Sequence, residues 1–540
     1  MALSAPQIIG KGTWLDRVAS EIIERERKLG RSVQVLRVES GLGASGIPHI
    51  GNFSDAARAW GIKLALESAG QKAEFIAFSD DKDGLRRVPA GFPKELSKYI
   101  GFPVTDIPDP SHCHSHNSYG EHMSSLLLDA LDKTGIVYRS VSGTKAYRDG
   151  VFNRQIDKIL RNAQRIGEII KETLGQDKYT EVLPYFPVCE SCGRIYTTKA
   201  LEYVPAHHVV RYQCEGTELS GKTLKGCGHK GETDVFSGKG KLSWKVEFAA
   251  RWSALKINYE PYGKELIDSV KVNDRIMMEI LEEPPPYHTR YEHFIDKRGV
   301  KISKSVGNVI APQLWLRYAS AQTLLLLMYK RSVGSRAIWI RDIPVYIAEF
   351  DDLEDRYFGQ KRTGDPKEEA RLRGLYEYCW NLMPPNKPTV HVPHNLLVYL
   401  FKVAPKVREK EFVIEKLKDY RYTINENDPR YKERLEHAAN WASEIDTLTI
   451  QPVELKREER DAVIELAAIV NASNDENYLQ NVVFTLAKKH NLETGPFFKT
   501  LYKILIGAES GPRLGPYIMA MGRQNVSAAL ANAARASSEK

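Results

Sequence analysis

The spacing of hydrophobic and polar residues in the first part of the chain predicts alternating strands and helices. Residues 33–39 form a short apolar run typical of a buried parallel strand, whereas residues 49–69 repeat apolar side chains at helical spacing. A second apolar run, 73–79, predicts the next strand. This order is typical of a doubly wound parallel sheet, an α/β fold whose ligands bind at the carboxyl ends of the strands.

A glycine-rich turn joins the first expected strand to the first expected helix. Gly41, Gly43 and Gly46 allow backbone N–H groups to approach an anion closely. Pro48 and His49 follow at the start of the helix, where the helix dipole favours negative charge. The turn therefore predicts a phosphate site.

The same glycines also match the dinucleotide fingerprint G-x-G-x-x-G, which makes a nicotinamide or flavin oxidoreductase an alternative. Such an enzyme needs an acidic residue about 20 positions further on to hold a ribose. Here the next strand ends at Asp80 and Asp81, well beyond that distance. The spacing therefore disfavours the oxidoreductase, which would bind nicotinamide or flavin tightly.

Four cysteines between positions 189 and 227 have the spacing of a metal site. Cys189 and Cys192 form a zinc-knuckle turn, and Cys214 and Cys227 complete the set. Four thiolates this close together in a reducing compartment favour tetrahedral structural zinc over disulfides. Two alternatives stay open: the cysteines are buried without a metal, or His229 replaces Cys227 as the fourth ligand.

A second group of metal-ligand residue types occupies the loop between positions 109 and 122. Its candidate ligands are Asp109, Cys113, His114 and His122. Histidine and cysteine suit zinc, but turn-rich loops also collect His and Ser without a metal. The loop is therefore either a second metal site or an ordinary turn.

Composition adds information on compartment and partner. The 540 residues and 61.1 kDa suffice for several domains, and no apolar run approaches the ~20 residues that a membrane helix requires. The first 30 residues lack a signal-peptide core, so we expect a cytoplasmic protein without a membrane span. A net charge of +8 favours a polyanionic partner.

Two widely separated segments resemble the signatures of one enzyme class. Residues 48–52, Pro-His-Ile-Gly-Asn, resemble the HIGH signature of class I aminoacyl-tRNA synthetases, with Asn52 in place of the second histidine. Residues 301–305, Lys-Ile-Ser-Lys-Ser, resemble the KMSKS loop. A mobile loop with two lysines can bring positive charge to a triphosphate during attack on the α-phosphorus. Taken alone, 301–305 could also be a solvated basic turn after a hairpin at 290–300.

Further segments make most of the chain resemble class I lysyl-tRNA synthetase. They are 79–86 after the second strand, the four-cysteine insert, 244–252 and 263–269. The chain departs from the family in two places: Leu266 stands where the family often has histidine, and two extra residues sit in the loop 109–122. The remaining alternatives are another class I synthetase, for glutamate, glutamine or cysteine, and a non-catalytic zinc-containing RNA-binding protein.

The resemblance implies an enzyme that uses ATP and Mg²⁺ to convert L-lysine to lysyl-adenylate and then transfers the lysine to tRNA(Lys). It implies a Rossmann-type catalytic domain in two parts, 1–99 and 241–345, separated by an acceptor-binding insertion with structural Zn²⁺ at 100–240. An all-α anticodon-binding domain is expected at 346–540. We expect the enzyme to be a monomer.

The resemblance also assigns roles to individual residues. Catalysis falls to His49, Lys301 and Lys304, which neutralise phosphate charge. The expected ATP-binding residues are Gly46, Pro48, His49, Ile50, Gly51, Asn52, Lys301, Ser303, Lys304 and Ser305.

A desolvated lysine ammonium needs a carboxylate or an aromatic face. The expected lysine-binding residues are Gly41, Gly43, Ser45, Asp80, Asp81, Asp83, Trp244, Trp252 and Asp268. Tryptophans are often core residues and aspartates after strands are often helix caps, so some of these side chains can have a structural role instead.

Overall fold

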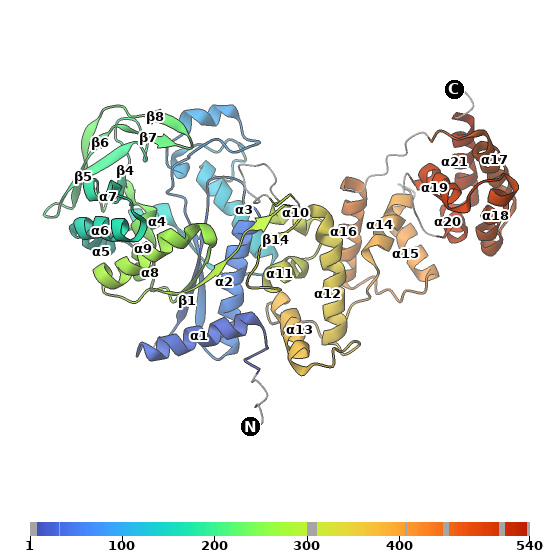
Figure 1. The fold of residues 1–540 in the computed structure, drawn as a ribbon, viewed down its shortest axis with the longest axis horizontal. Helices are drawn as coiled ribbons and strands as arrows, with labels where there is room; N and C mark the ends of the chain where they lie inside the picture. The colour runs from blue at the N-terminus through green and yellow to red at the C-terminus, as the bar shows by residue number, and fades with distance from the viewer. Residues whose placement is uncertain are drawn as a thin grey trace. The chain divides into compact units, whose positions relative to one another are not determined.

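The chain forms two compact units, Met1–Pro388 and Thr389–Lys540 (Figure 1). The computed structural model describes residues 8–31, 33–296, 298–299, 310–404, 408–445, 453–506 and 513–536. No helix within these ranges has the length and hydropathy needed to cross a membrane.

Five parallel strands form the central sheet of the first unit, in the order β12-β11-β1-β2-β3. These strands are β1 (Leu36–Leu42), β2 (Ala73–Ser79), β3 (Arg139–Ser142), β11 (Tyr259–Gly263) and β12 (Tyr287–Tyr291). Because β1 is the middle strand, its carboxyl end lies between those of β2 and β11. This sheet with its helices confirms the predicted α/β, Rossmann-type fold.

Helices cover both faces of the sheet. α1 (Trp14–Lys28) packs on α2 (Ile50–Ser68), which packs on β1, β2 and β11. Figure 1 shows α2 and α8 (Trp244–Leu255) on opposite sides of β1. The predicted ranges 49–69 and 73–79 match α2 and β2 closely, because both elements have uninterrupted apolar periodicity.

β1 begins and ends later than the predicted range 33–39. The strand continues through Glu39, Ser40 and Gly41, all buried or nearly so. A buried glutamate is tolerated here because Arg251 of α8 lies 2.5 Å from its carboxylate. An apolar run in the sequence does not show that Glu39 has a buried partner. The predicted strand therefore began and ended too early.

The segment between β2 and α8 returns once to the main sheet, as β3, and otherwise forms small helices and antiparallel sheets. Its helices are α3 (Tyr119–Lys133), α4 (Gly143–Arg148), α5 (Asn153–Arg161), α6 (Ala163–Leu174) and α7 (Lys178–Glu181). Its other strands are β4 (Tyr185–Pro187), β5 (Thr198–Val204), β6 (Val209–Cys214), β7 (Gly216–Leu219), β8 (Lys222–Lys225), β9 (Lys230–Asp234) and β10 (Gly240–Leu242). The antiparallel groups are β5-β6-β9, β7-β8 and β4-β10.

Two local predictions in the first unit are wrong. The sequence of residues 153–173 is helix-like and predicts one helix, but the segment divides into α5 and α6, because Asn162 departs from helical geometry at φ −108° and ψ 21°. No hairpin forms among the described residues of 290–300. Instead β13 (Phe294–Ile295) pairs in parallel with β14 (Arg336–Ala337), which comes from much later in the chain.

The first unit extends beyond position 345, although the helical domain was expected to begin at position 346. It is completed by α9 (Ile267–Ile276), α10 (Pro312–Leu316), α11 (Ala321–Tyr329), α12 (Ile343–Tyr357) and α13 (Pro366–Cys379). α12 and α13 pack on each other and on α11, and the Tyr378 hydroxyl donates to Asp16 of α1 at 2.7 Å. These contacts place both helices in the first unit despite their charged composition.

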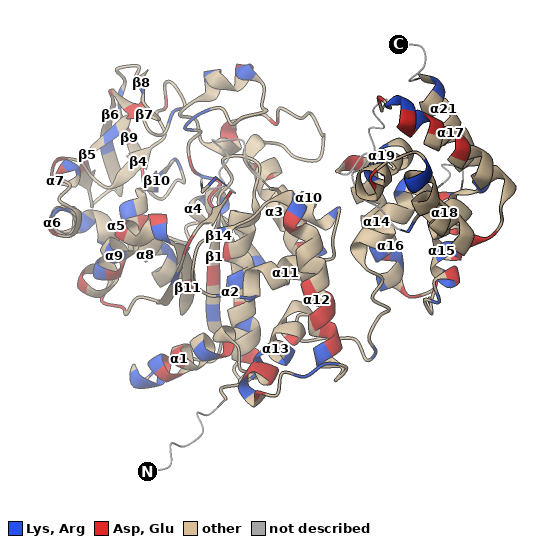
Figure 2. Ribbon diagram, turned by 45° about the vertical axis from the view of Figure 1, so that its right-hand side comes forward, with Lys and Arg blue, Asp and Glu red and all other residues tan. Residues whose placement is uncertain are grey.

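The described residues of the second unit form only helices. They are α14 (His394–Val403), α15 (Glu409–Asp419), α16 (Pro429–Glu444), α17 (Arg457–Ala472), α18 (Glu476–Lys489), α19 (Thr494–Ile506), α20 (Leu514–Met521) and α21 (Arg523–Ala536). Apolar stripes such as Leu479, Val483 and Leu486 on α18 are buried. Figure 2 shows Lys and Arg mixed with Asp and Glu on the outer faces of these helices.

Candidate functional site

A cavity of about 990 Å³ lies at the carboxyl ends of the central strands. Its lining comes from the glycine turn, the loop after β2, and the first residues of α8 and α9. The lining residues are Gly43, Ala44, Ser45, Asp80, Asp83, Gly84, Arg86, Arg87, Pro89, Ser220, Trp244, Glu265, Leu266 and Ser269. This is the edge at which a doubly wound sheet binds its ligands.

His49 is the N-cap of α2 and fixes the start of that helix. The Gly51 N–H donates to His49 Nδ1 at 3.0 Å, and the His49 N–H donates to Asn52 Oδ1 at 3.2 Å. Asn52 thus completes a reciprocal capping box in the position where the signature has a second histidine. Gly51 is required because a Cβ there would lie 2.7 Å from His49 Cε1.

This cap also determines the tautomer of His49. Because Nδ1 accepts from the Gly51 N–H, the proton of the neutral ring is on Nε2. His49 therefore presents an N–H donor near the positive end of the α2 dipole, where an anion is stabilised.

Arg251 of α8 joins three carboxylates, one from within β1, one directly after β2 and one near the start of β11. Its guanidinium lies 2.5 Å from Glu39, 3.1 Å from Asp80 and 3.0 Å from Glu260. All four side chains are almost fully buried. Burial raises the pKa of Asp80 to about 8, and Arg251 offsets only part of that effect. Burial likewise raises the pKa of Glu39 well above its usual range.

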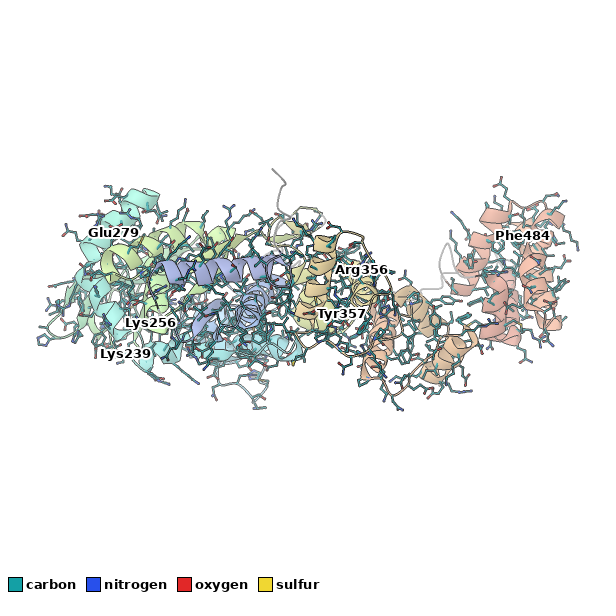
Figure 3. The ribbon with its side chains drawn as sticks, turned by 90° about the horizontal axis from the view of Figure 1, so that it is seen from below. Lys239, Lys256, Glu279, Arg356, Tyr357 and Phe484 are labelled. Atoms are coloured by element: carbon teal, nitrogen blue, oxygen red, sulfur yellow. The ribbon has the colours of Figure 1, made fainter. Side chains whose placement is uncertain are left out.

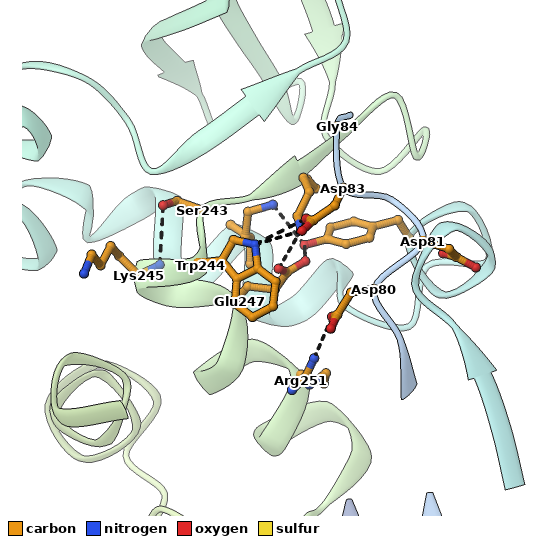
Figure 4. A network of polar contacts seen from close by, with 12 residues as sticks. Asp80, Asp81, Asp83, Gly84, Ser243, Trp244, Lys245, Glu247 and Arg251 are labelled. Carbon is orange, nitrogen blue, oxygen red and sulfur yellow. Dashed lines mark hydrogen bonds and ion pairs between the residues drawn. The ribbon is translucent and has the colours of Figure 1, made fainter. Parts of the chain in front are cut away.

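Asp83, three residues after Asp80, has different partners. Trp244 donates its indole N–H to Asp83 at 3.2 Å, and the Lys241 ammonium contacts the same carboxylate (Figure 4). Asp80, Asp83 and Trp244 therefore converge on one cavity, as the sequence predicted, with Ser45 and Gly43. The partners Lys241 and Arg251 were not identified from sequence, because no local pattern marks a lysine or arginine as buried.

Four of the expected lysine-binding residues do not line the cavity, and neither do the expected ATP-binding residues at positions 46 and 48–52. Asp81 turns away to accept from Ser142 at 2.6 Å and from the Thr144 N–H at 2.7 Å, so it fixes the start of α4. Trp252 is buried, lies 5.7 Å from Phe248 by ring centroids and donates to Glu260. Asp268 is exposed on α9. Gly41 lies beneath the cavity, where a Cβ would approach Asp80 Oδ2 to 3.2 Å.

The four cysteines of the insert converge as predicted. Cys189 Sγ lies 3.6 Å from Cys227 Sγ, and Cys192 Sγ lies 3.8 Å from Cys214 Sγ. All four ligand atoms lie within 4.8 Å of one another, and none is in a disulfide. A tetrahedron of thiolates about 2.3 Å from a zinc ion has edges of about 3.8 Å, so this arrangement fits zinc. His229 is not part of the cluster.

A second cluster forms in the loop 109–122, with one ligand different from the predicted set. The ligand atoms of Asp109, Cys113, His116 and His122 lie within 4.8 Å of one another, and His114 is not among them. His112 and His114 have left-handed φ values of 52° and 57°, so the backbone reverses there and brings His116 to the cluster.

The expected lysine-rich loop falls outside the described part of the chain. Lys301, Ser303, Lys304 and Ser305 all lie in the undescribed stretch 300–309. The next described residue, Ile310, accepts from the Ile50 N–H at 2.9 Å. The chain therefore emerges from this stretch beside the first turn of α2.

Comparisons with known proteins agree with this geometry. The family model of the class I tRNA synthetases (K) matches residues 12–380. A lysine–tRNA ligase from Cenarchaeum symbiosum is 46% identical over 96% of this chain and 98% of its own length. One from Rickettsia felis is 30% identical over 90% of each chain. A glutamate–tRNA synthetase structure from Elizabethkingia anophelis covers 93% of this chain and 99% of its own, with 12% identity and a TM-score of 0.41.

These matches show that the chain is a class I aminoacyl-tRNA synthetase. Within that class, the chain belongs to the K family of class I tRNA synthetases, whose model covers most of the first unit. The glycine turn, the His49 cap and the acidic cavity all lie inside the matched range.

The raised pKa of Asp80 predicts a pH-dependent difference between the wild type and Asp80→Asn. Folded Asp80 keeps a proton that the unfolded chain releases at a pKa near 4, so its contribution to the free energy of unfolding falls as pH rises from about 4 to about 8. The neutral asparagine has no such dependence. The thermal midpoint of Asp80→Asn minus that of the wild type should therefore increase between about pH 5 and about pH 8.

The exposed Asp268→Asn is the matched control, and its midpoint difference should stay constant over this range. A constant difference for Asp80→Asn as well would show that Asp80 is ionised in the folded protein.

Proposed function

We propose that this chain is a lysine–tRNA ligase that forms lysyl-adenylate from L-lysine and ATP and then esterifies the terminal adenosine of tRNA(Lys). The observation that carries this proposal is the placement of a capped helix N-terminus and an acidic, tryptophan-lined cavity at one edge of the sheet. The helix N-terminus suits a triphosphate, and the acidic cavity suits an ammonium. The similarity to lysine–tRNA ligases over nearly the full chain supports the same assignment.

The phosphate end uses the start of α2. The N–H groups after Gly46 and the Nε2–H of His49 stabilise charge on the α-phosphate while the lysine carboxylate attacks and pyrophosphate leaves. Pro48, Ile50, Gly51 and Asn52 hold this turn in place. We assign Lys301 and Lys304, with Ser303 and Ser305, to the β- and γ-phosphates. Mg²⁺ accompanies ATP and is held mainly by its phosphates.

The amino acid end uses the acidic side of the cavity. Asp83 and Trp244 offer a carboxylate and an aromatic face to the lysine side-chain ammonium, and Asp80 adds negative charge behind them. Arg86 and Arg87 line the same cavity and suit the phosphates of ATP or of the tRNA end. A glutamate-specific pocket would need such an arginine at the position that Asp83 occupies.

Pyrophosphate exchange tests this assignment directly. Of the twenty amino acids, L-lysine should support ATP–pyrophosphate exchange, measured with and without tRNA(Lys). His49→Asn should slow it by about 10²–10³, because a charge-stabilising donor is lost while asparagine still caps the helix.

The thermal midpoint of His49→Asn should match that of the wild type, which separates the phosphate role from the cap. Exchange that depends on glutamate, glutamine or cysteine would assign the chain to another specificity. Exchange by His49→Asn at the wild-type rate would show that His49 has no role in the mechanism.

We propose structural zinc at the four-cysteine cluster, held by Cys189, Cys192, Cys214 and Cys227. The sulfur separations and the absence of disulfides among these residues support it. We propose a second zinc at Asp109, Cys113, His116 and His122, whose donors match the N, O and S ligands that zinc accepts. Both clusters lie in the predicted insertion. Around the four cysteines the apolar cluster is small, with Tyr212 as its one large side chain, so a metal there would add stability that packing does not supply.

Elemental analysis tests both metal sites. Protein purified without added metal should contain about two zinc ions per chain. Cys189→Ser and Cys113→Ser should each lower the content by about one, and Cys189→Ser should also lower the thermal midpoint. Cys379→Ser is the control, since Cys379 is buried outside both clusters. A protein free of zinc would remove both assignments.

We propose that the helical second unit binds the anticodon region of the tRNA. The segment 402–434 of this unit is rich in Lys and Arg, but several of these side chains form ion pairs with acidic residues close by in the sequence. Arg408 pairs with Glu415, Lys416 with Asp419, and Lys418 with Glu426. α18 and α19 offer a better surface for RNA bases. Phe484, labelled in Figure 3, is 48% exposed and lies 5.2 Å from Phe498 by ring centroids.

Tyr502 continues this aromatic row at 6.2 Å from Phe498. Lys488 and Lys499 are exposed on the same two helices. Phe484 is exposed, whereas Phe498 and Tyr502 are partly buried. Accessible aromatic rings beside lysines are typical of surfaces on which unpaired bases stack. The row formed by Phe484, Phe498 and Tyr502 is therefore our candidate contact for the anticodon bases.

Truncation of one ring tests this contact. Phe484→Ala should lower kcat/KM for tRNA(Lys) about tenfold or more, because one stacked base contributes about 1–3 kcal/mol. The KM for lysine should not change. Ile464→Ala removes an equally exposed apolar side chain from α17 and should have no effect on charging. Equal charging by Phe484→Ala and the wild type would exclude this ring from RNA binding.

A further inference from the structure

Lys241 is a buried cation beside the cavity. Neither step of the proposed reaction uses it. It lies on β10 with a side chain only 2% exposed. Its ammonium contacts Asp83 and lies 2.8 Å from Glu247 Oε2. It also lies 5.3 Å from the centroid of the Trp244 ring. A lysine ammonium in such a place must be held by its acidic partners.

The surrounding hydrogen bonds leave Lys241 little freedom. Glu247 Oε1 accepts from the Tyr147 hydroxyl at 2.7 Å, and that hydroxyl accepts from the Leu242 N–H at 2.9 Å. β10 itself pairs with β4. Glu247 is therefore fixed on one side of Lys241, and the ammonium is directed towards Asp83.

This arrangement limits how Asp83 can bind a ligand. Lys241 engages Asp83 Oδ1, and the Trp244 indole N–H lies 3.3 Å from Oδ1 and 3.2 Å from Oδ2. Figure 4 shows the indole directed at this carboxylate. A guanidinium binds a carboxylate best through two parallel hydrogen bonds that use both oxygens. An ammonium is a point charge that needs only one of them.

The charge balance favours a single additional cation. Asp83 and Glu247 carry two negative charges, and in the described part of the chain Lys241 is the one cation in an ion pair with either of them, although Arg86 attracts Asp83 from a longer distance. A ligand ammonium on the free side of Asp83 would complete the balance, and it would sit against the Trp244 ring.

We propose that Lys241 is a specificity-determining residue that reserves Asp83 for an ammonium and rejects the guanidinium of arginine. This inference rests on the proposed function, because it names the residue that sets the amino acid selectivity of the same site. Lys241 acts through Asp83, so it is a positioning residue and contacts neither ATP nor the reacting carboxylate.

The test compares lysine with arginine in ATP–pyrophosphate exchange. Lys241→Met keeps the length of the side chain and removes its charge. It should raise the KM for lysine with a smaller change in kcat, because Asp83 loses its orientation, and it should increase kcat/KM for arginine. The ratio of kcat/KM for lysine over arginine should fall about 100-fold, the scale of the discrimination that the fit of a side chain in one pocket supplies.

Two further variants keep the test decisive. Lys241→Met with Glu247→Gln removes one cation and one anion, so the buried charge balance is preserved and a folding defect is avoided. It should show the same loss of discrimination. Lys245→Met, on the first turn of α8 and outside the cavity lining, is the matched control and should keep the wild-type ratio.

The outcomes separate this inference from the proposed function. A wild type that shows no exchange with lysine overturns both. A wild type that activates lysine, together with a double variant that is folded and retains the wild-type lysine-to-arginine ratio, overturns the role of Lys241 alone.

Discussion

The ion cluster around Arg251 is the interaction on which the carboxyl edge of the sheet depends. It joins Glu39 of β1, Asp80 after β2 and Glu260 of β11, so three neighbouring strands share one guanidinium from α8. Removal of one partner from a buried ion pair costs about 3–5 kcal/mol, and here one cation serves three carboxylates. The position of Asp80 in the cavity is therefore coupled to the packing of α8 on the sheet.

The same region contains more acidic than basic side chains in its ion pairs. Three carboxylates around Arg251 and two around Lys241 share these two cations. In the Arg251 cluster, protonation relieves part of the excess, since burial raises the pKa of Asp80 to about 8. At Asp83 the remaining charge faces the cavity, where a bound ammonium can neutralise it.

Local patterns were sufficient to predict α2, β2 and the four-cysteine cluster, because each depends on periodicity or spacing within a short segment. The partners of the acidic loop were not predictable in this way. Lys241 and Arg251 lie far along the chain from Asp83 and Asp80, and only the return of the chain to the sheet brings them together. Three aspartates in the 80–83 loop consequently have three roles: Asp80 in the Arg251 cluster, Asp81 as a cap for α4 and Asp83 in the cavity.

Similar reasoning applies to two positions at which the chain was expected to depart from the family. Two extra residues were expected in the loop 109–122, and its cluster contains His116, two positions after the predicted His114. At the signature, Asn52 can replace a histidine because its position is the third of the helix, where the requirement is an acceptor for the backbone N–H of the cap residue. At position 49 the cap needs only a side-chain acceptor, which asparagine also supplies, whereas the ring Nε2–H is a feature that asparagine lacks. The cap thus leaves both positions open to an amide side chain, and the proposed phosphate contact is what favours histidine at position 49.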